Sequence, residues 1–576
     1  MTTGVLDNTE VHESPTERVA AAFRRIAEVD RPEVWITLRP REEVVADAAA
    51  VEARLAAGES LPLAGALLAV KDNIDVAGLP TTAACPEFAY DAAVTAVAVR
   101  RLVAAGAIVL GKTNLDQFAT GLVGTRSPYG AVRNALDPEL VSGGSSSGSA
   151  VAVALGIADI GIGTDTAGSG RVPAALHGIV GVKASLGIIP AHGVVPACAD
   201  YDAVTVFAAD LPAAVAAARL MAGPDAGDPR SRTWPADVAL AAPATPRLAV
   251  PRAADLAVLS PEYRAAFAAT VAGLGEAGIE TTEIDVSGLL AAALLLYDGS
   301  VVAERFAAVG EFLAADPASA DPTVAAIIAA AGRTTGPGFA ADLDTLARAK
   351  AAAVALLADV DGLLLPTTTE HPSIAAVAAD PIGINRRMGT YTNFCNLLDM
   401  AAVAVPGSPT ASGAPFGVMV VTPAFGDQVA VDIAARIVGV ESPAFVAEGV
   451  ELAVFGAHLR GQPLHWQLER IGARFAGEIT TSDAYRLTAL DTVPAKPGLV
   501  RHGTGLGAPI LGELFRVSRA GLGQFLAELP PPMALASIDL ADGRAVVGFA
   551  CSFDAASAAT DITAFGGWKA YLQRQN

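Results

Sequence analysis

The sequence lacks the cysteine patterns that support disulfide-rich folds and zinc sites. Its four cysteines, Cys85, Cys198, Cys395 and Cys551, are far apart and include no CxxC pair. Disulfide frameworks and structural zinc sites both require clustered or regularly spaced ligands. We therefore expect four reduced, buried thiols, with neither a disulfide framework nor a zinc site.

Long apolar runs are also missing, although 52% of the residues are hydrophobic. No window reaches the roughly 18 uninterrupted apolar residues that a membrane-spanning helix requires. The first residues, MTTGVLDNTEVHESPTER, contain neither the basic start nor the apolar stretch of a secretory signal. These features favour a cytoplasmic location.

Positive charge is scarce. The 39 Lys and Arg residues face 60 Asp and Glu residues, which gives a formal net charge of -21. Such a charge repels the phosphates of nucleic acids and the head groups of anionic membranes, and it disfavours both as main partners. An anionic small-molecule substrate would instead need a locally placed Lys or Arg.

What the chain does have is enough length for more than one domain, at 576 residues. Ala, Arg and Glu recur at helical spacing over residues 16–58, so residues 1–60 are predicted to form an N-terminal helical segment. From 61 to 445, predicted helices alternate with short apolar strands such as AIVLGKTN (107–114), the pattern of an α/β layered domain.

Two further segments complete this predicted organisation. The Pro/Asp/Gly-rich stretch at 221–247 is expected to form a long surface excursion. Residues 452–576 contain strand-like segments separated by glycine turns, and Asp542-Gly543 between two apolar runs predicts a hairpin. We expect a smaller C-terminal domain of α+β character.

Two short motifs match known patterns by their letters alone. Gly106 to Thr113, GAIVLGKT, has the spacing of a phosphate-binding loop, but its AIVL core favours a strand and a helix precedes it, where that loop follows a strand. Gly144 to Gly148, GSSSG, matches the nucleophile elbow of α/β-hydrolases and would nominate Ser146. An elbow follows a buried strand, whereas the preceding NALDPELVSG is polar. The α/β-hydrolase interpretation is therefore a runner-up.

Three other segments carry the residues needed for a serine hydrolase. The turn GTDTAGSGRVPA leaves backbone N–H groups unobstructed beside Ser169, as an oxyanion hole requires. The run AVKDNIDV places Lys71 at the end of a buried segment, where desolvation lowers the pKa of an amine toward that of a usable base. The third segment is the Ser-rich GGSSSGSA at 143–150.

In chain order, the Lys71 run, GGSSSGSA and GTDTAGSGRVPA resemble the amidase signature family over roughly residues 60–440. The resemblance implies a layered mixed sheet flanked by helices and a Ser-Ser-Lys triad. Its members would be Ser169 as nucleophile, Ser145 as a bridging serine that follows a cis peptide bond, and Lys71 as base. It implies neither a metal nor an organic cofactor. The backbone amides expected to hold the oxyanion are those of Thr166, Ala167, Gly168 and Ser169.

Within this family the chain resembles the allophanate hydrolases, which implies release of ammonia and carbon dioxide from allophanate, urea-1-carboxylate. The supporting features are the Ala-Gly pair before Ser169, where many members have Gly-Gly, and PTTTEHP at 366–372. The resemblance assigns Tyr297 and Arg305 to the substrate carboxylate. Eight residues apart on one helix, they would lie about 80° around and two turns along. Without the resemblance, a solvated Arg and a core Tyr are the simpler interpretation.

The C-terminal segments VFGAHLRGQPLHWQL and DITAFGGWKAYL resemble the additional domain of allophanate hydrolases, which has a γ-glutamyl-cyclotransferase-like fold. The resemblance implies that this domain assists decarboxylation of the intermediate left after the first ammonia is lost. His458 is the candidate catalytic group, with His465 and His502 as rivals. A urea carboxylase as functional partner and a homodimer are also implied.

Two alternatives remain. One is a broader amidase, or an amidotransferase subunit of the same family that receives ammonia from a partner. The other is an inactive scaffold that kept the fold. The C-terminal segment and the Tyr297/Arg305 pair argue against the first, and the intact Lys71, Ser145 and Ser169 argue against the second.

Overall fold

The computed structural model describes residues 13–575 and divides them into two compact units. Unit 1 contains residues up to 234 together with 245–445, and unit 2 contains 235–244 together with the residues from 446 onward. The predicted surface excursion has neither helix nor strand over residues 222–246. Ten residues in its second half, 235–244, belong to unit 2, although residues of unit 1 flank them in the sequence.

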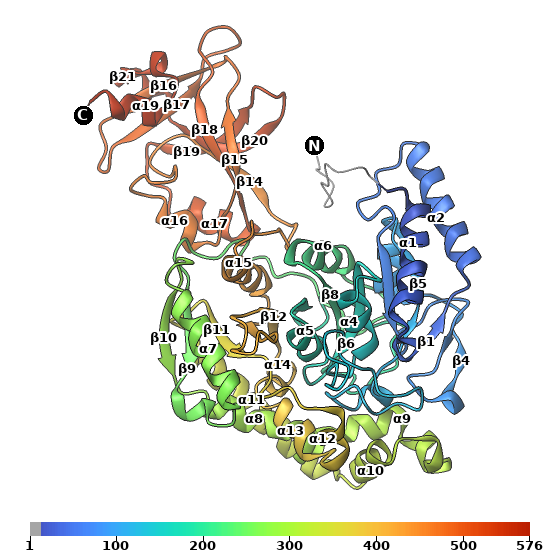
Figure 1. The fold of residues 1–576 in the computed structure, drawn as a ribbon. Coiled ribbons are helices and arrows are strands. Elements are labelled where there is room, and N and C mark those ends of the chain that lie inside the picture. The colour runs from blue at the N-terminus through green and yellow to red at the C-terminus, as the bar shows by residue number, and fades with distance from the viewer. Residues whose placement is uncertain (1–12, 576) are drawn as a thin grey trace. The chain divides into compact units, whose positions relative to one another are not determined.

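Unit 1 is built on a mixed sheet in which eleven strands are described (Figure 1). In sheet order they are β1 (Trp35–Leu38), β5 (Ile108–Thr113), β2 (Leu67–Lys71), β6 (Ile160–Asp165), β8 (Ala203–Ala208), β7 (Val180–Lys183), β12 (Met400–Pro406), β13 (Gly417–Pro423), β11 (Gly362–Pro366), β9 (Arg247–Pro251) and β10 (Glu280–Ile284). β5, β2 and β6 are parallel to one another, as are β11, β9 and β10, and antiparallel pairs join the two sets.

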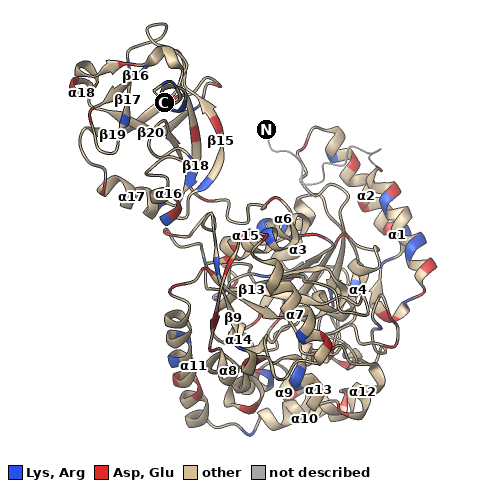
Figure 2. Cartoon of the chain, turned by 60° about the vertical axis from the view of Figure 1, so that its left-hand side comes forward, with Lys and Arg blue, Asp and Glu red and all other residues tan. Residues whose placement is uncertain are grey.

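Helices pack around this sheet (Figure 1). They are α1 (Pro15–Val29), α2 (Arg41–Ala56), α3 (Val97–Ala104), α4 (Ser147–Ala154), α5 (Val172–His177), α6 (Leu211–Met221), α7 (Pro261–Gly273), α8 (Ser287–Asp298), α9 (Ala303–Ala315), α10 (Pro322–Ala331), α11 (Gly336–Leu356), α12 (Ile374–Ala379), α13 (Gly383–Met388), α14 (Asn393–Leu397) and α15 (Asp427–Val438). Figure 2 shows charges of both signs along α1, α2 and α11, as expected for helices with a solvent-facing side.

Unit 2 contains a five-stranded sheet and a three-stranded sheet among its described residues. The first has the order β15 (Arg474–Thr480), β18 (Leu511–Val517), β14 (Val450–Val454), β20 (Ala545–Cys551) and β19 (Met533–Asp539), and the second has β17 (Lys496–Arg501), β16 (Tyr485–Leu490) and β21 (Thr560–Asp561). The helices are α16 (Trp466–Arg470), α17 (Arg519–Ala527), α18 (Phe553–Ala558) and α19 (Trp568–Gln573). The predicted architecture, a layered mixed sheet with helices plus a smaller α+β part, is confirmed, and so is the hairpin at Asp542-Gly543.

The helical segment predicted over 16–58 contains two helices, and the prediction missed the short strand β1, which separates α1 from α2. Pro32 and Pro40 bracket this segment, and its Trp-Ile-Thr-Leu sequence favours a strand. β1 pairs antiparallel with β5 at the sheet edge. A Cβ at Gly111 would lie only 2.3 Å from the Thr37 carbonyl oxygen, so a glycine in β5 permits this close pairing.

Small residues make α4 possible as a helix surrounded by protein. Residues 147–153 of this helix are all buried. A Cβ at Gly148 would lie 2.4 Å from the carbonyl oxygen of Val34, so the backbones approach too closely for a larger residue. The Gly/Ser-rich stretch is therefore a packed element of the core and not a flexible linker.

No single helix among residues 13–575 has the length and apolarity needed to cross a membrane. By the same criteria a bent pair, α8 with the segment 300–315, passes the test jointly, with a 43° change of direction at the break.

Candidate active site

Two parallel neighbours in the sheet, β2 and β6, bring the candidate catalytic residues to one edge. Val70 of β2 is in register with Ile162 of β6, so both strands end at the same side of the sheet. Lys71 is the last residue of β2, and Asp165 is the last residue of β6. The turn that follows β6 carries Ser169, which is 3% exposed.

The three predicted triad residues lie in one hydrogen-bonded chain. Lys71 Nζ is 2.8 Å from Ser145 Oγ, and Ser145 Oγ is 3.0 Å from Ser169 Oγ. Lys71 Nζ also donates to Thr164 Oγ1 at 2.7 Å. The peptide bond between Gly144 and Ser145 is cis. The hydroxyl of Ser169 is thus connected to the amine of Lys71 through one bridging hydroxyl. This is the geometry of an activated serine.

Burial sets the protonation of the amine. Lys71 is completely buried, and desolvation lowers its pKa to about 7. The negative charges of Asp116, Asp202 and Asp165 oppose this shift, and the positive charge of Arg305 adds to it. A substantial fraction of Lys71 is therefore neutral near pH 7, as a general base must be.

Gly144 is required because the bridging turn packs directly on Asp116. A Cβ at position 144 would lie 2.0 Å from Asp116 Oδ2. The Asp116 carboxylate accepts hydrogen bonds from the backbone N–H groups of Val123, Gly124 and Arg126, while its own N–H donates to the Ser145 carbonyl at 3.1 Å. Asp116 thus fixes the turn that aims Ser145.

The turn before Ser169 is held by a buried ion pair. Arg171 binds both oxygens of Asp165 at 2.9 Å, and Asp165 Oδ2 accepts the Gly170 N–H at 2.9 Å. Gly168 has φ of +149°, and a Cβ there would lie 2.4 Å from Thr392 Oγ1. This glycine lets the chain pass close to α14 and present its amides beside Ser169.

Thr166, the first residue of the predicted oxyanion hole, is anchored by an acid that the sequence did not single out. Its hydroxyl donates to Asp202 Oδ1, and Asp202 Oδ2 accepts the Ala197 N–H at 2.8 Å. Burial raises the pKa of Asp202. Asp202 lies 36 positions beyond Thr166 in the chain, so no local pattern indicates their contact.

The structure brings Tyr297 and Arg305 together, but not on one helix as their spacing suggested. α8 ends at Asp298, and α9 begins at Ala303. The Arg305 guanidinium lies 3.4 Å from Tyr297 Oη and 5.3 Å from the centre of its ring. Gly299 at the break adopts an extended conformation, with Leu295 O 2.7 Å from the position that a Cβ would occupy.

Arg305 is 1% exposed and is not a solvated helix residue. Its Nη1 donates to Thr120 Oγ1 at 2.8 Å, while its buried Nε has no hydrogen-bond partner within the described residues. No carboxylate pairs with it there. A buried guanidinium with a free donor is suited to bind an anionic group.

The residues of the two alternative motifs, GSSSG and GAIVLGKT, have structural roles. Ser146 Oγ donates to the Thr164 carbonyl at 3.1 Å and accepts its N–H at 3.3 Å, so this serine ties α4 to β6. Most of GAIVLGKT forms strand β5, and the Lys112 ammonium pairs with buried Asp72 at 3.0 Å. Residues in an extended strand cannot wrap a phosphate with their own amides.

Of the three histidine candidates in unit 2, His458 is the most enclosed. It is 6% exposed, its ring stacks on Phe549 with centres 4.6 Å apart, and burial lowers its pKa to about 4. His465 is close by, with Nδ1 donating to the His458 carbonyl at 3.1 Å. His502 is exposed and lies against Phe553.

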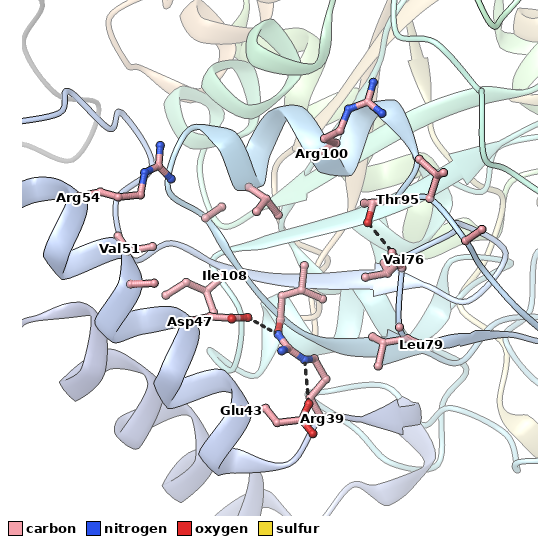
Figure 3. Close-up of a pocket in the computed structure, with 18 residues that line it drawn as sticks. Arg39, Glu43, Asp47, Val51, Arg54, Val76, Leu79, Thr95, Arg100 and Ile108 are labelled. Carbon is pink, nitrogen blue, oxygen red and sulfur yellow. Dashed lines mark hydrogen bonds and ion pairs between the residues drawn. The ribbon is translucent and has the colours of Figure 1, made fainter.

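A cavity of about 620 Å³ lies elsewhere in unit 1 (Figure 3). Neither Lys71 nor either triad serine lines it. Arg39 on its wall binds Asp47 at 2.6 Å and the Val109 carbonyl at 3.0 Å. Within residues 13–575, no group of three or more His, Cys, Asp or Glu side chains is arranged to hold a metal ion.

A family model described as Amidase matches residues 17–431, and one described as the allophanate hydrolase C-terminal domain matches residues 450–573. The chain therefore belongs to the amidase family and is an amidohydrolase that also carries this C-terminal domain.

Among solved structures, the allophanate hydrolase of Kluyveromyces lactis is 38% identical with a TM-score of 0.87, covering 98% of this chain and 97% of that one. The urea amidolyase of Kluyveromyces lactis has a TM-score of 0.89 at 38% identity, over 98% of this chain and 36% of its own. The urea amidolyase of Lachancea kluyveri is 42% identical over 550 residues, which are 89% of this chain and 30% of that protein. The chain thus spans about a third of the length of the curated urea amidolyases it matches.

Proposed function

We propose that this amidohydrolase hydrolyses allophanate, with Ser169 as nucleophile, Ser145 as proton relay and Lys71 as base. The observation that carries the proposal is the chain of contacts from Ser169 Oγ to Ser145 Oγ at 3.0 Å and on to Lys71 Nζ at 2.8 Å. Both serines and the lysine are buried, so bulk water does not compete for these hydrogen bonds.

In the first step, neutral Lys71 takes the proton of Ser145 as Ser145 takes the proton of Ser169. Ser169 Oγ then attacks the amide carbonyl, and the negative charge develops on the carbonyl oxygen. The backbone N–H groups from Thr166 to Ser169 are the proposed donors to this oxyanion. Asp165, Arg171 and Asp202 keep this turn in place through the bonds described above.

Collapse of the tetrahedral intermediate breaks the C–N bond, and the leaving nitrogen takes a proton from Lys71 through Ser145 and departs as ammonia. Water, deprotonated through the same relay, then attacks the acyl-enzyme and releases Ser169. The relay acts first as base and then as acid, which requires a lysine whose pKa lies close to the working pH. The pKa of about 7 for Lys71 fits this requirement.

Arg305 and Tyr297 are proposed to bind the substrate carboxylate. Arg305 combines complete burial with the absence of a described carboxylate partner, so a substrate carboxylate would supply its missing counter-charge. This pair would distinguish allophanate from a neutral amide of similar size.

Hydrolysis of the allophanate amide in unit 1 leaves the dicarboxylate ⁻O₂C–NH–CO₂⁻. We propose that unit 2 assists its decarboxylation at His458: one C–N bond breaks, carbon dioxide leaves, and the electron pair remains on nitrogen, which takes a proton from solvent. The nitrogen of the resulting carbamate then takes a further proton, its remaining C–N bond breaks, and ammonia and the second carbon dioxide are released. Because allophanate is carboxylated urea, a urea carboxylase is the functional partner that would supply it. Cytoplasmic location and dimerisation stay predictions.

The test compares ammonia release from allophanate, malonamate and neutral aliphatic amides by the purified full chain. Allophanate should be preferred, and Ser169→Ala should abolish release from every substrate. Arg305→Ala should lose at least 100-fold in kcat/KM on the two carboxylated substrates and far less on neutral amides, as expected for a buried charge-assisted contact. Arg333→Ala, at an exposed arginine, is the matched control. Equal preference for neutral amides would replace the proposal with a broader amidase.

A further inference from the structure

Unit 2 contains a small cavity that is lined by His458 and by a positively charged side chain, Lys496. Its volume is about 150 Å³, and its lining includes His458, Gln467, Lys496, Phe525 and Met533. A dry engineered cavity of about this volume holds benzene, a molecule of six heavy atoms. The space therefore suits a ligand of about five to seven non-hydrogen atoms.

His458 has one ring nitrogen committed and one not. Its Nε2 lies 2.8 Å from Gln467 Oε1, an acceptor, so Nε2 carries the proton of the neutral ring. Within residues 13–575, the hydrogen bond of Nε2 is the one that the His458 ring forms, and Nδ1 has no partner there. Stacking on Phe549 and edge contact with Phe525 fix the plane of the ring. The neutral imidazole is thus held with a fixed orientation at the wall of the cavity.

Lys496 supplies the positive charge of the cavity. It is the first residue of β17, is half-buried, and forms no ion pair or side-chain hydrogen bond with any described residue. Its charge is close enough to His458 to help lower the pKa of that ring. Glu528 also lines the cavity, but its carboxylate is exposed and is neutralised by its ion pair with Arg470. A cation without a counter-ion among the described residues therefore lines a small cavity that has both polar and apolar walls.

We propose that Lys496 is the carboxylate-binding residue of this cavity, and that the cavity takes a small dicarboxylate beside the His458 ring. This inference rests on the proposed function, because the dicarboxylate left by the first step, with seven non-hydrogen atoms, has the matching size and charge. Lys496 binds this ligand, and Gln467 positions the His458 ring that faces it.

The binding test uses malonate, which replaces the central N–H of that dicarboxylate by CH₂. Full-length protein with ¹³C-labelled histidine is titrated with malonate, and the His458 ring resonance, assigned with His458→Gln, is followed by NMR. Lys496→Met and Lys496→Gln should weaken binding at least tenfold, and Lys496→Arg should retain it within about threefold. Arg501→Met, at the other end of β17, should leave the affinity unchanged because Arg501 is exposed and pairs with Asp539.

Malonate that leaves the His458 resonance unmoved, or binds Lys496→Met and Lys496→Gln as tightly as the unaltered chain, overturns the proposal. Binding that weakens equally in Arg501→Met does so too, because it reflects net charge only. These outcomes are separable from a failure of the proposed function, since malonate contains no amide for Ser169 to attack. If Ser169→Ala kept releasing ammonia from allophanate, the amidase mechanism would fail while the malonate result stood.

Discussion

At the scale of single residues, the proposed chemistry depends on a lysine that loses its charge easily. Among the described residues, Lys71 Nζ donates to Ser145 and Thr164, and neither is an anion. The three aspartates that oppose its desolvation act through space without forming an ion pair with it. An ammonium directly paired with a carboxylate would stay protonated and could not serve as a base.

This environment predicts the pH dependence of the reaction. Because only neutral Lys71 can accept the proton, kcat/KM should fall about tenfold per pH unit below an apparent pKa near 7 and level off above it. Initial rates of ammonia release, measured from pH 5 to 9, give this profile. Lys71→Arg, which keeps the charge but cannot act as a base, should be inactive throughout, and Lys350→Met, at the surface, should retain the profile.

Much of this site could be predicted from the sequence because its parts are continuous motifs. Lys71 ends an apolar run, and both serines lie in glycine-rich turns. Asp202 and Gln467 could not be found in this way, since each acts through a contact made by the fold. Thr164 lies inside a quoted motif, but only the alignment of β2 with β6 shows that its hydroxyl faces Lys71.

At the scale of elements, turns and helix ends set the positions of the catalytic atoms. The turn after β6 passes α14 so closely that Gly168 cannot carry a side chain. The break between α8 and α9 lets Tyr297 and Arg305 meet. The sequence did not predict this break because no proline marks it and both helices are rich in helix-forming residues.

Gly168→Ala should therefore impair both catalysis and folding. The new methyl group would meet Thr392, and the positive φ alone costs about 1–3 kcal/mol for a residue other than glycine. Denaturant unfolding and kcat/KM together report the two effects. Gly275→Ala, where a Cβ has no atom within 4 Å and no positive φ, is the control and should change neither. An active, fully stable Gly168→Ala would contradict the described path of this turn.

The ion pair between Asp165 and Arg171 joins β6 to α14, since Arg171 also bonds the Thr392 carbonyl and Asn396 Oδ1. Arg171→Met leaves Asp165 buried without its partner and should lower the free energy of unfolding of unit 1 by about 3–5 kcal/mol. The double variant Asp165→Asn/Arg171→Met removes both charges and should lose less. Urea denaturation of Arg171→Met, Asp165→Asn and the double variant measures this coupling, and additive losses would show that the pair is not coupled.

At the scale of the whole molecule, the chain enters unit 2 twice. Residues 235–244 belong to unit 2, whereas the residues on both sides of them belong to unit 1. This could not be predicted, because the stretch has the composition of an ordinary loop. Leu240 is 1% exposed there, and its N–H donates to the Gly472 carbonyl at 2.9 Å. The packing of unit 2 thus depends on residues that lie more than 200 positions before its main segment in the sequence.

Leu240→Ala should accordingly lower the unfolding transition of unit 2 and leave that of unit 1 in place. Truncation of a buried leucine costs about 2–5 kcal/mol. Differential scanning calorimetry of the full chain, with Leu136→Ala at an exposed leucine of unit 1 as control, separates the two transitions. A shift of the unit 1 transition alone would show that residues 235–244 stabilise unit 1 and not unit 2, contrary to this account.

The central claim, that Ser169 is activated through Ser145 and Lys71, is tested most directly by covalent labelling with a fluorophosphonate and peptide mass spectrometry. The account predicts a single adduct, on Ser169, that is absent in Ser169→Ala and forms at least 100-fold more slowly in Lys71→Arg and Ser145→Ala. An adduct on Ser146, or labelling that persists unchanged in Ser169→Ala, would contradict it.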